Sequence, residues 1–308
     1  MDANARELRK SWNALGRGQR GLVIFCLLVS LAALISGMHR AKKGRNALLK
    51  WGPVYEAIEA GEPIYEVGEE GYPTLPITLM LMAPFHALGP MGGAFAWALV
   101  RIGLAWWLVL TCMRMAAGRA RELPWGAQAI VLLLSLRVLF SEIQHANINL
   151  WVACCLVLAA RNWAQDRQGW GGAWIGIGAA MKVTPALGIV LILRDRSVKG
   201  LAGFAAGLGA SLCLPALWLG VGRTYDMTIA WGRQMLLPYL EGRELGLRQT
   251  EHINQSLLGW LGRFFTDSVA IPAHSGWPTE DVSATWVALS PGGFRLLHGA
   301  ACLVVLGV

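Results

Sequence analysis

The chain has 308 residues, of which 55% are hydrophobic and only 15% are charged. A water-soluble domain with one core cannot solvate that balance, so the composition excludes an ordinary soluble protein and favours one that uses the bilayer as its solvent. The net charge of +8 does not indicate nucleic-acid binding, because the Lys and Arg residues flank apolar runs rather than forming one basic stripe.

The N-terminal segment 1–20 is basic, and the positive-inside rule therefore predicts that it lies in the cytoplasm. The apolar run 21–38 lacks a small-residue cleavage motif and continues into a charged loop, so we interpret it as a signal anchor. The six cysteines all lie within apolar runs without metal-ligand spacing, which predicts reduced packing residues and no metal site.

Several later runs approach the length of about 20 residues that a helix needs to cross a hydrocarbon core. They lie at 73–88, 92–113, 125–140, 147–161, 170–193 and 200–222. With the first run they predict seven crossings, although a re-entrant path stays open for the short runs 73–88 and 125–140. An eighth run begins near residue 295, and we expect it to be truncated at Val308.

Seven crossings place two long polar segments, 39–72 and 223–290, on the same outer face. The first contains VYEAIEAGEPIYE, a helical pattern that ends at Gly61, and we expect a short helix on the membrane surface there. The second contains QSLLGWLGRFF at 255–265 and should fold against the membrane domain. The predicted fold class is thus an all-α, polytopic helical membrane protein whose long outer loops carry short interfacial helices.

Polar side chains inside apolar helices are costly and therefore mark candidate sites. The first group is a cluster of polar residues at the start of the apolar run that follows residue 140. Its alternative interpretation is a structural cluster of hydrogen bonds between helices. It comprises Glu142, Gln144, His145, Asn147 and Asn149. The second is Lys182 in AAMKVTP, where a buried ammonium needs an anion; either an external phosphate or a structural carboxylate such as Glu142 meets that need.

Two further groups lie in the expected outer segments. The segment 250–263 combines residues that can hold sugar hydroxyls and accept a proton, although Asn-Gln-Ser is also an ordinary helix N-cap. Its polar members are Glu251, His252, Asn254, Gln255, Ser256 and Arg263. The other group comprises Tyr55, Glu56, Tyr65 and Tyr72 with Pro73 and Pro76, and taken alone it favours architecture over chemistry.

Taken together, these motifs resemble glycosyltransferase family 87, the bacterial polyprenol-phosphate-mannose-dependent mannosyltransferases of the GT-C superfamily. The matching features run in order over about residues 46 to 265. They are VYEAIEAGEPIYE, YPTLPITLMLMAPFHALGP, ANINL, AAMKVTP and HINQSLLGWLGR. The family's third motif usually reads Gly-Gln-x-Asn-Leu, so Ala146 and Asn147 depart from it while Asn149 and Leu150 match.

The resemblance implies a single GT-C-like transmembrane domain over 21–308 in a bacterial inner membrane. It implies transfer of a hexose, mannose in particular, from a polyprenyl-phosphate donor to a lipid or glycan acceptor at the outer face. Membrane lipids are the remaining expected partners, with no nucleic acid, and no cofactor is expected beyond the lipid-linked sugar phosphate that serves as donor.

The same resemblance assigns roles to residues of this chain. Lys182 and Arg263 are expected to bind the donor phosphate. Sugar or acceptor contacts are expected from Tyr55, Tyr72, Gln144, His145, Asn147, Asn149, Asn254, Gln255 and Ser256.

One departure concerns the base that accepts the acceptor's proton. The family carries an acidic residue shortly before the Tyr-Glu-Ala stretch, where this chain has Asn46, Ala47 or Lys50. Glu56, Glu251 or His252 would have to substitute, and His252 beside Glu251 is favoured because imidazole titrates near neutral pH. A catalytically inactive scaffold of the same fold remains an alternative, as does a transporter or binding protein for an anionic lipid-linked substrate.

Overall fold

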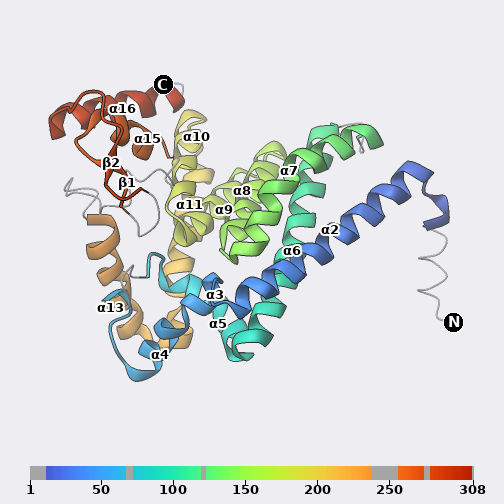
Figure 1. The fold of residues 1–308 in the computed structure, drawn as a ribbon, viewed down its shortest axis with the longest axis horizontal. Helices are drawn as coiled ribbons and strands as arrows, with labels where there is room; N and C mark the ends of the chain where they lie inside the picture. The colour runs from blue at the N-terminus through green and yellow to red at the C-terminus, as the bar shows by residue number, and fades with distance from the viewer. Residues whose placement is uncertain (1–11, 67–71, 119–122, 238–255, 274–277, 307–308) are drawn as a thin grey trace. The chain divides into compact units, whose positions relative to one another are not determined.

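The computed structural model describes residues 12–66, 72–118, 123–237, 256–273 and 278–306. The chain divides into two compact units, Met1–Trp231 and Gly232–Val308, which are described separately below. Helices dominate both units (Figure 1), and the described residues contain one short two-stranded sheet. The predicted all-α class is confirmed.

The first unit is built of helices alone in its described part. In chain order they are α2 (Arg17–Lys42), α3 (Ala47–Lys50), α4 (Gly52–Ala60), η1 (Ile64–Glu66), α5 (Pro76–Ala87), α6 (Gly89–Ala117), α7 (Trp125–His145), α8 (Asn149–Ala164), α9 (Gln168–Met181), η3 (Thr184–Gly188), α10 (Ile189–Arg194), α11 (Val198–Cys213), α12 (Ala216–Leu219) and α13 (Val221–Trp231).

Four helical stretches in the described residues are long and apolar enough to cross a membrane. They are Arg17–Lys50, Gly89–Ala117, Trp125–His145 and Val198–Leu219. The protein is therefore a multi-pass membrane protein. A re-entrant path was left open for the two short runs 125–140 and 73–88. The first is part of α7, a helix of 21 residues, whereas the second contains α5, a helix of 12 residues.

The expectation of one continuous helix over 170–193 is wrong. Helix α9 ends at Met181, and the chain resumes as η3 and then α10. Pro185 explains the break, because in a continuous helix its ring would clash with the carbonyl of Met181 four residues earlier and its missing N–H would leave that carbonyl unpaired. Lys182 consequently lies in extended backbone, with φ −154° and ψ 129°.

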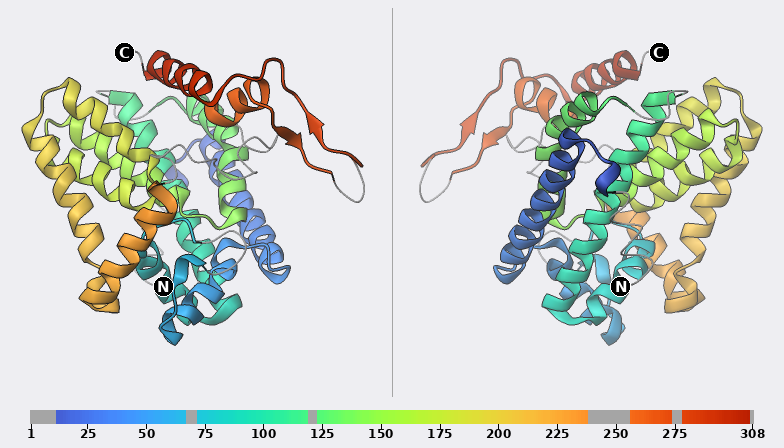
Figure 2. Two further views of the ribbon diagram at one scale, coloured as in Figure 1. Left: turned by 90° about the vertical axis from the view of Figure 1, so that its left-hand side faces the viewer. Right: turned by 90° about the vertical axis from the view of Figure 1, so that its right-hand side faces the viewer.

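Helices α9 and α11 pack backbone against backbone, and they run side by side in both views of Figure 2. Each carries a Gly-x-x-x-Gly pair, Gly172 with Gly176 and Gly203 with Gly207. A Cβ built on any of these four glycines would approach the partner's backbone to under 3.0 Å, closer than real Cβ atoms come. Small residues let membrane helices associate through such close packing.

The first long polar segment contains the short helix that its pattern predicts. Helix α4 ends at Ala60, and Gly61 caps it in the left-handed conformation at φ 79°. Tyr55 packs α4 onto α5, since its hydroxyl donates to the carbonyl of Leu79 at 2.9 Å and its ring stacks on His86 at 4.1 Å. Whether α4 lies on the membrane surface and which face it occupies stay predictions.

The second unit combines α15 (Leu257–Phe265), the antiparallel strands β1 (Val269–Ile271) and β2 (Val282–Ser283), and α16 (Pro291–Leu306). The strand pair lies within the expected loop 223–290, where the sequence pattern indicated only a helix. An aromatic cluster holds this unit together, because Phe264 packs against both Trp260 and Trp286. The predicted boundaries at 20/21, 39–72 and 223–290 stay predictions.

Candidate functional site

Lys182 is exposed at the break after α9 rather than buried among apolar residues as expected. The break, which Pro185 imposes, frees the side chain from the helix it would otherwise line. Irregular backbone at membrane depth is tolerated where it lines a cavity or is covered by protein. An accessible ammonium at such a break can meet a ligand, whereas a buried ammonium would need an internal counter-ion.

Asn149 connects Lys182 to Glu142. The Lys182 Nζ donates to Asn149 Oδ1 at 3.1 Å, and Asn149 Nδ2 donates to Glu142 Oε1 at 3.2 Å. Since an ammonium only donates and a carboxylate only accepts, these neighbours fix the orientation of the amide. Among the described residues, Lys182 makes no ion pair with Glu142 within 4.0 Å. The Glu142 carboxylate therefore influences Lys182 indirectly, by holding the Asn149 amide with its oxygen toward the ammonium.

The turn between α7 and α8 places Asn149 next to Glu142. Helix α7 ends at His145 because Ala146 adopts the left-handed conformation, φ 63°, and α8 then begins at Asn149. Ala146 is fully buried, and its carbonyl accepts the indole N–H of Trp97 at 3.0 Å. Glu142 on the last turn of α7 and Asn149 on the first turn of α8 are thereby held side by side.

Arg101 on α6 supports the same turn, and sequence reasoning missed it. Its side chain is fully buried; Nη1 donates to the backbone carbonyls of Glu142 and Ile143, and Nε donates to the carbonyl of Trp97. A cation at the end of a helix also interacts favourably with the helix dipole. The signal was present, because a charge inside the apolar run 92–113 meets the same criterion that selected Lys182.

The rest of the 141–149 cluster points elsewhere. Gln144 donates to the Ser36 hydroxyl on α2 at 2.5 Å, and the exposed His145 pairs through Nδ1 with the Ser141 carbonyl of its own helix. Asn147 lies half-buried in the turn. The structure thus brings only Glu142 and Asn149 of this cluster into hydrogen-bonded connection with Lys182.

The re-entry of the first polar segment packs beside the end of α9. Leu75 and Ile77 form one buried cluster with Ala180, two residues before Lys182. Tyr72 is buried against Trp51, with ring centroids 5.6 Å apart. Two of the groups singled out in the sequence, the segment around Tyr72 and Lys182, therefore belong to the same region of the first unit.

The tyrosines and the carboxylate of this segment differ in exposure. Burial raises the pKa of Tyr55 and of Tyr72, so both keep their phenolic proton and cannot accept one at neutral pH. Glu56, by contrast, is exposed on α4. Asn46, near the position of the family's acidic residue, is buried and caps α3 by accepting the Leu48 N–H at 2.9 Å.

Part of the third group, the predicted site segment 250–263, lies in the second unit. Ser256 is the N-cap of α15, since its hydroxyl accepts the Gly259 N–H at 3.1 Å, as the alternative interpretation of this motif anticipated. Arg263 is buried on the same helix. Four of the predicted site residues lie outside the described residues: Glu251, His252, Asn254 and Gln255.

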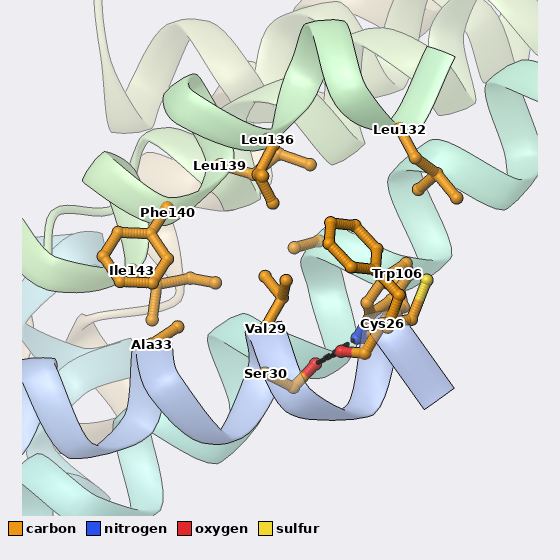
Figure 3. A pocket seen from close by; sticks show the side chains of 12 residues that line it. Cys26, Val29, Ser30, Ala33, Trp106, Leu132, Leu136, Leu139, Phe140 and Ile143 are labelled. Carbon is orange, nitrogen blue, oxygen red and sulfur yellow. Dashed lines mark hydrogen bonds between the residues drawn. The ribbon is translucent and has the colours of Figure 1, made fainter. Parts of the chain in front are cut away.

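An apolar cavity of about 40 Å³ between α2, α6 and α7 is separate from this chemistry (Figure 3). Its lining includes Val29, Leu136 and Phe140, and its polar edge is the hydrogen bond from Trp106 Nε1 to Ser30 Oγ at 2.9 Å. None of the site residues predicted from the sequence lines it. It is a packing void rather than a substrate site.

These features define a multi-pass helical membrane protein with an accessible cation at a helix break, held by an amide that a carboxylate orients. The sequence model of glycosyltransferase family 87 matches residues 72–308, and the chain belongs to that family. It is accordingly a membrane glycosyltransferase. No curated protein and no solved structure matches the chain.

Proposed function

We propose that the chain transfers a hexose, mannose in particular, from a polyprenyl-phosphate donor to a hydroxyl of a lipid or glycan acceptor. We place the reaction at the outer face of a bacterial inner membrane. The observation that carries this proposal is the exposed ammonium of Lys182, oriented by Asn149 and Glu142 at the break between α9 and η3. Family membership supports the reaction class.

In the proposed reaction the acceptor oxygen attacks the anomeric carbon of the sugar while the bond from that carbon to the phosphate oxygen breaks. The acceptor's proton passes to a base, and the departing polyprenyl phosphate gains negative charge. A preorganised cation stabilises that developing charge without reorganising at the moment of reaction. Lys182 uses one of its three N–H donors on Asn149, which leaves two for the phosphate among the interactions of the described residues.

The base is proposed to be His252 with Glu251 as its neighbour, and Glu56 is the second candidate. Glu56 is exposed and free to meet an acceptor. Glu142 is a positioning residue instead, because its Oε2 atom is buried and its Oε1 atom is held by Asn149. Its role is to keep the amide oxygen of Asn149 turned toward Lys182.

The test is transfer of a labelled sugar from a polyprenyl-phosphate donor by the purified full chain in lipid. Lys182→Ala should lower kcat/KM about 100-fold or more, the usual loss for one charge-stabilising donor. Lys199→Ala removes an equally exposed lysine at the start of α11 and should leave transfer unchanged. Transfer undiminished by both Lys182→Ala and His252→Ala would reject the proposed site.

An inactive scaffold is the second candidate, and Asn46 is the observation that favours it. At the position nearest the family's acidic residue, the chain has a buried amide that serves as a helix cap. Absence of transfer by the native chain with every donor offered, together with normal folding, would favour the scaffold. Transfer that disappears in His252→Ala or Glu56→Gln would show that another base has replaced the missing carboxylate.

A further inference from the structure

A groove of about 510 Å³ lies between α2 and α7, outside the apolar cavity. Its apolar wall on α7 is formed by Leu133, Leu136 and Phe140, which recur at helical spacing along one face. Val29 and Ala32 supply the facing wall on α2. Val29, Leu136 and Phe140 also line the inner cavity, where Figure 3 shows them, so the cavity and the groove share these three side chains.

Arg137 gives this groove a charge. Its side chain is exposed on the groove face, two residues beyond Ser135 at the centre of α7. Arg137 lies eight residues before the end of α7 at His145, about 12 Å along the helix, so its long side chain can extend toward that end of the span. A cation left unpaired inside a span costs about 2.5 to 3.5 kcal/mol on insertion scales at the helix centre. In the part of the chain that the structure describes, Arg137 forms no ion pair within 4.0 Å. The energetics therefore call for an anion in this groove.

The protein itself offers little to neutralise Arg137. Glu142 is the one acidic residue that α2 and α7 contain, and it already accepts the amide of Asn149. Five positions along an α-helix turn the side chain by about 140°, so Glu142 points away from the face that carries Arg137. The groove is for the same reason distinct from the Lys182 region, which Glu142 faces.

A hydrogen bond closes one end of the groove. Gln144 Nε2 donates to Ser36 Oγ at 2.5 Å, tying α7 to α2 at that end. Arg137 and the hydroxyl of Ser141 face the groove on the side of this polar closure, and Leu133 and Leu136 lie on the side away from it. A hydrocarbon wall that leads to a cation and a hydroxyl matches a molecule with an acyl chain and an anionic oxygen group.

We propose that the groove binds one anionic glycerophospholipid of the surrounding bilayer, with an acyl chain on the apolar wall and the phosphate on Arg137. This site is independent of the proposed transfer reaction. Charge complementarity selects an anionic headgroup, because a zwitterionic headgroup brings a second cation to Arg137. Arginine also binds phosphate bidentately, which adds to the preference.

The experiment is native mass spectrometry of the full chain released from nanodiscs that contain equal amounts of phosphatidylglycerol and phosphatidylcholine. The native chain should retain one phosphatidylglycerol with about a tenfold preference over phosphatidylcholine. Arg137→Gln should abolish that preference, while the matched control Arg114→Gln, an exposed arginine on α6 outside the groove, should keep it. Ala32→Phe fills the groove beside its apolar wall without changing the charge and should expel the lipid.

Three outcomes would overturn the proposal. The first is equal retention of phosphatidylglycerol by the native chain and by folded Arg137→Gln or Ala32→Phe. The second is exclusive retention of an added polyprenyl phosphate, which would assign the groove to the donor lipid. The third is a dimer that dissociates in Arg137→Gln, which would make a second copy the occupant. Because the readout is retained lipid, a chain without transferase activity still tests the groove.

Discussion

Trp97 on α6 donates its indole N–H to the carbonyl of Ala146, the residue at which α7 ends. This bond holds an alanine at φ 63°, a conformation that costs an L-residue about 1–2 kcal/mol. The strain sits in the turn that aligns Glu142 with Asn149. The family's motif has glycine at this position, and the backbone conformation supplies a physical reason, because glycine adopts it without a Cβ clash.

Ala146→Gly should therefore stabilise the first unit by about 0.5–1 kcal/mol, the relief of the clash less the added freedom of glycine in the unfolded chain. The measurement is the apparent melting temperature of the chain in detergent, which should rise. Ala98→Gly, at a buried position inside α6, should lower it, since glycine weakens a helix interior. A fall of the melting temperature in both variants would contradict strain at Ala146.

Arg101→Met should destabilise the protein by about 3 kcal/mol. The change removes donors from two carbonyls at the end of α7, and each buried acceptor left unpaired costs about 1–3 kcal/mol. The carbonyl of Trp97 also loses a donor, but it keeps its helical partner, the backbone N–H of Arg101. Thermal unfolding with helical circular dichroism as readout measures the loss. Arg114→Met, at an exposed site on the same helix, should change stability by less than about 0.5 kcal/mol. Equal effects would mean that Arg101 does not support the turn.

Much of the helical framework could be predicted from the sequence, because apolar length and glycine caps are local signals. The end of α4 at Gly61 is one example. The break at Lys182 required a second step, namely the steric conflict between Pro185 and the carbonyl of Met181, and apolar composition alone concealed it. Hydropathy averages over a window, whereas a proline acts on one hydrogen bond.

The candidate site was predictable in its members but not in its connections. Glu142, Asn149 and Lys182 were each recognisable as polar groups in apolar surroundings, yet the pairing of Lys182 with Asn149 depends on how α8 packs against α9. Gln144 and His145 carried the same sequence signal and face other partners. The position of a residue along a helix determines which face of the helix carries its side chain. The packing of the helices determines which neighbouring residues that side chain contacts.

Gly203→Ala should disrupt the packing of α9 against α11. The new methyl group would meet the carbonyl of Gly169, which is backbone and cannot rotate away, so the two helices must separate. We expect a loss of about 2–4 kcal/mol, typical of overpacking and lost contacts. Gly209→Ala on the same helix meets nothing within 4 Å and should be neutral or stabilising. Limited proteolysis of the two variants distinguishes them, and equal resistance would refute the close contact.

Asn149→Asp should weaken donor binding while leaving the fold intact. The new carboxylate would take the place of an oxygen that lies 3.1 Å from Lys182 Nζ, and it would compete with the donor phosphate for the ammonium. It would also replace the amide that donates to Glu142, so two carboxylates would face each other beside one cation. We expect KM for the polyprenyl-phosphate sugar to rise about tenfold, equivalent to about 1.4 kcal/mol of lost binding, with a smaller change in kcat.

The control is Asn162→Asp, which introduces the same charge on α8 thirteen residues further along, where the native amide donates to the carbonyl of Leu158. An equal rise of KM in both variants would mean that general charge, rather than capture of Lys182, weakens the donor.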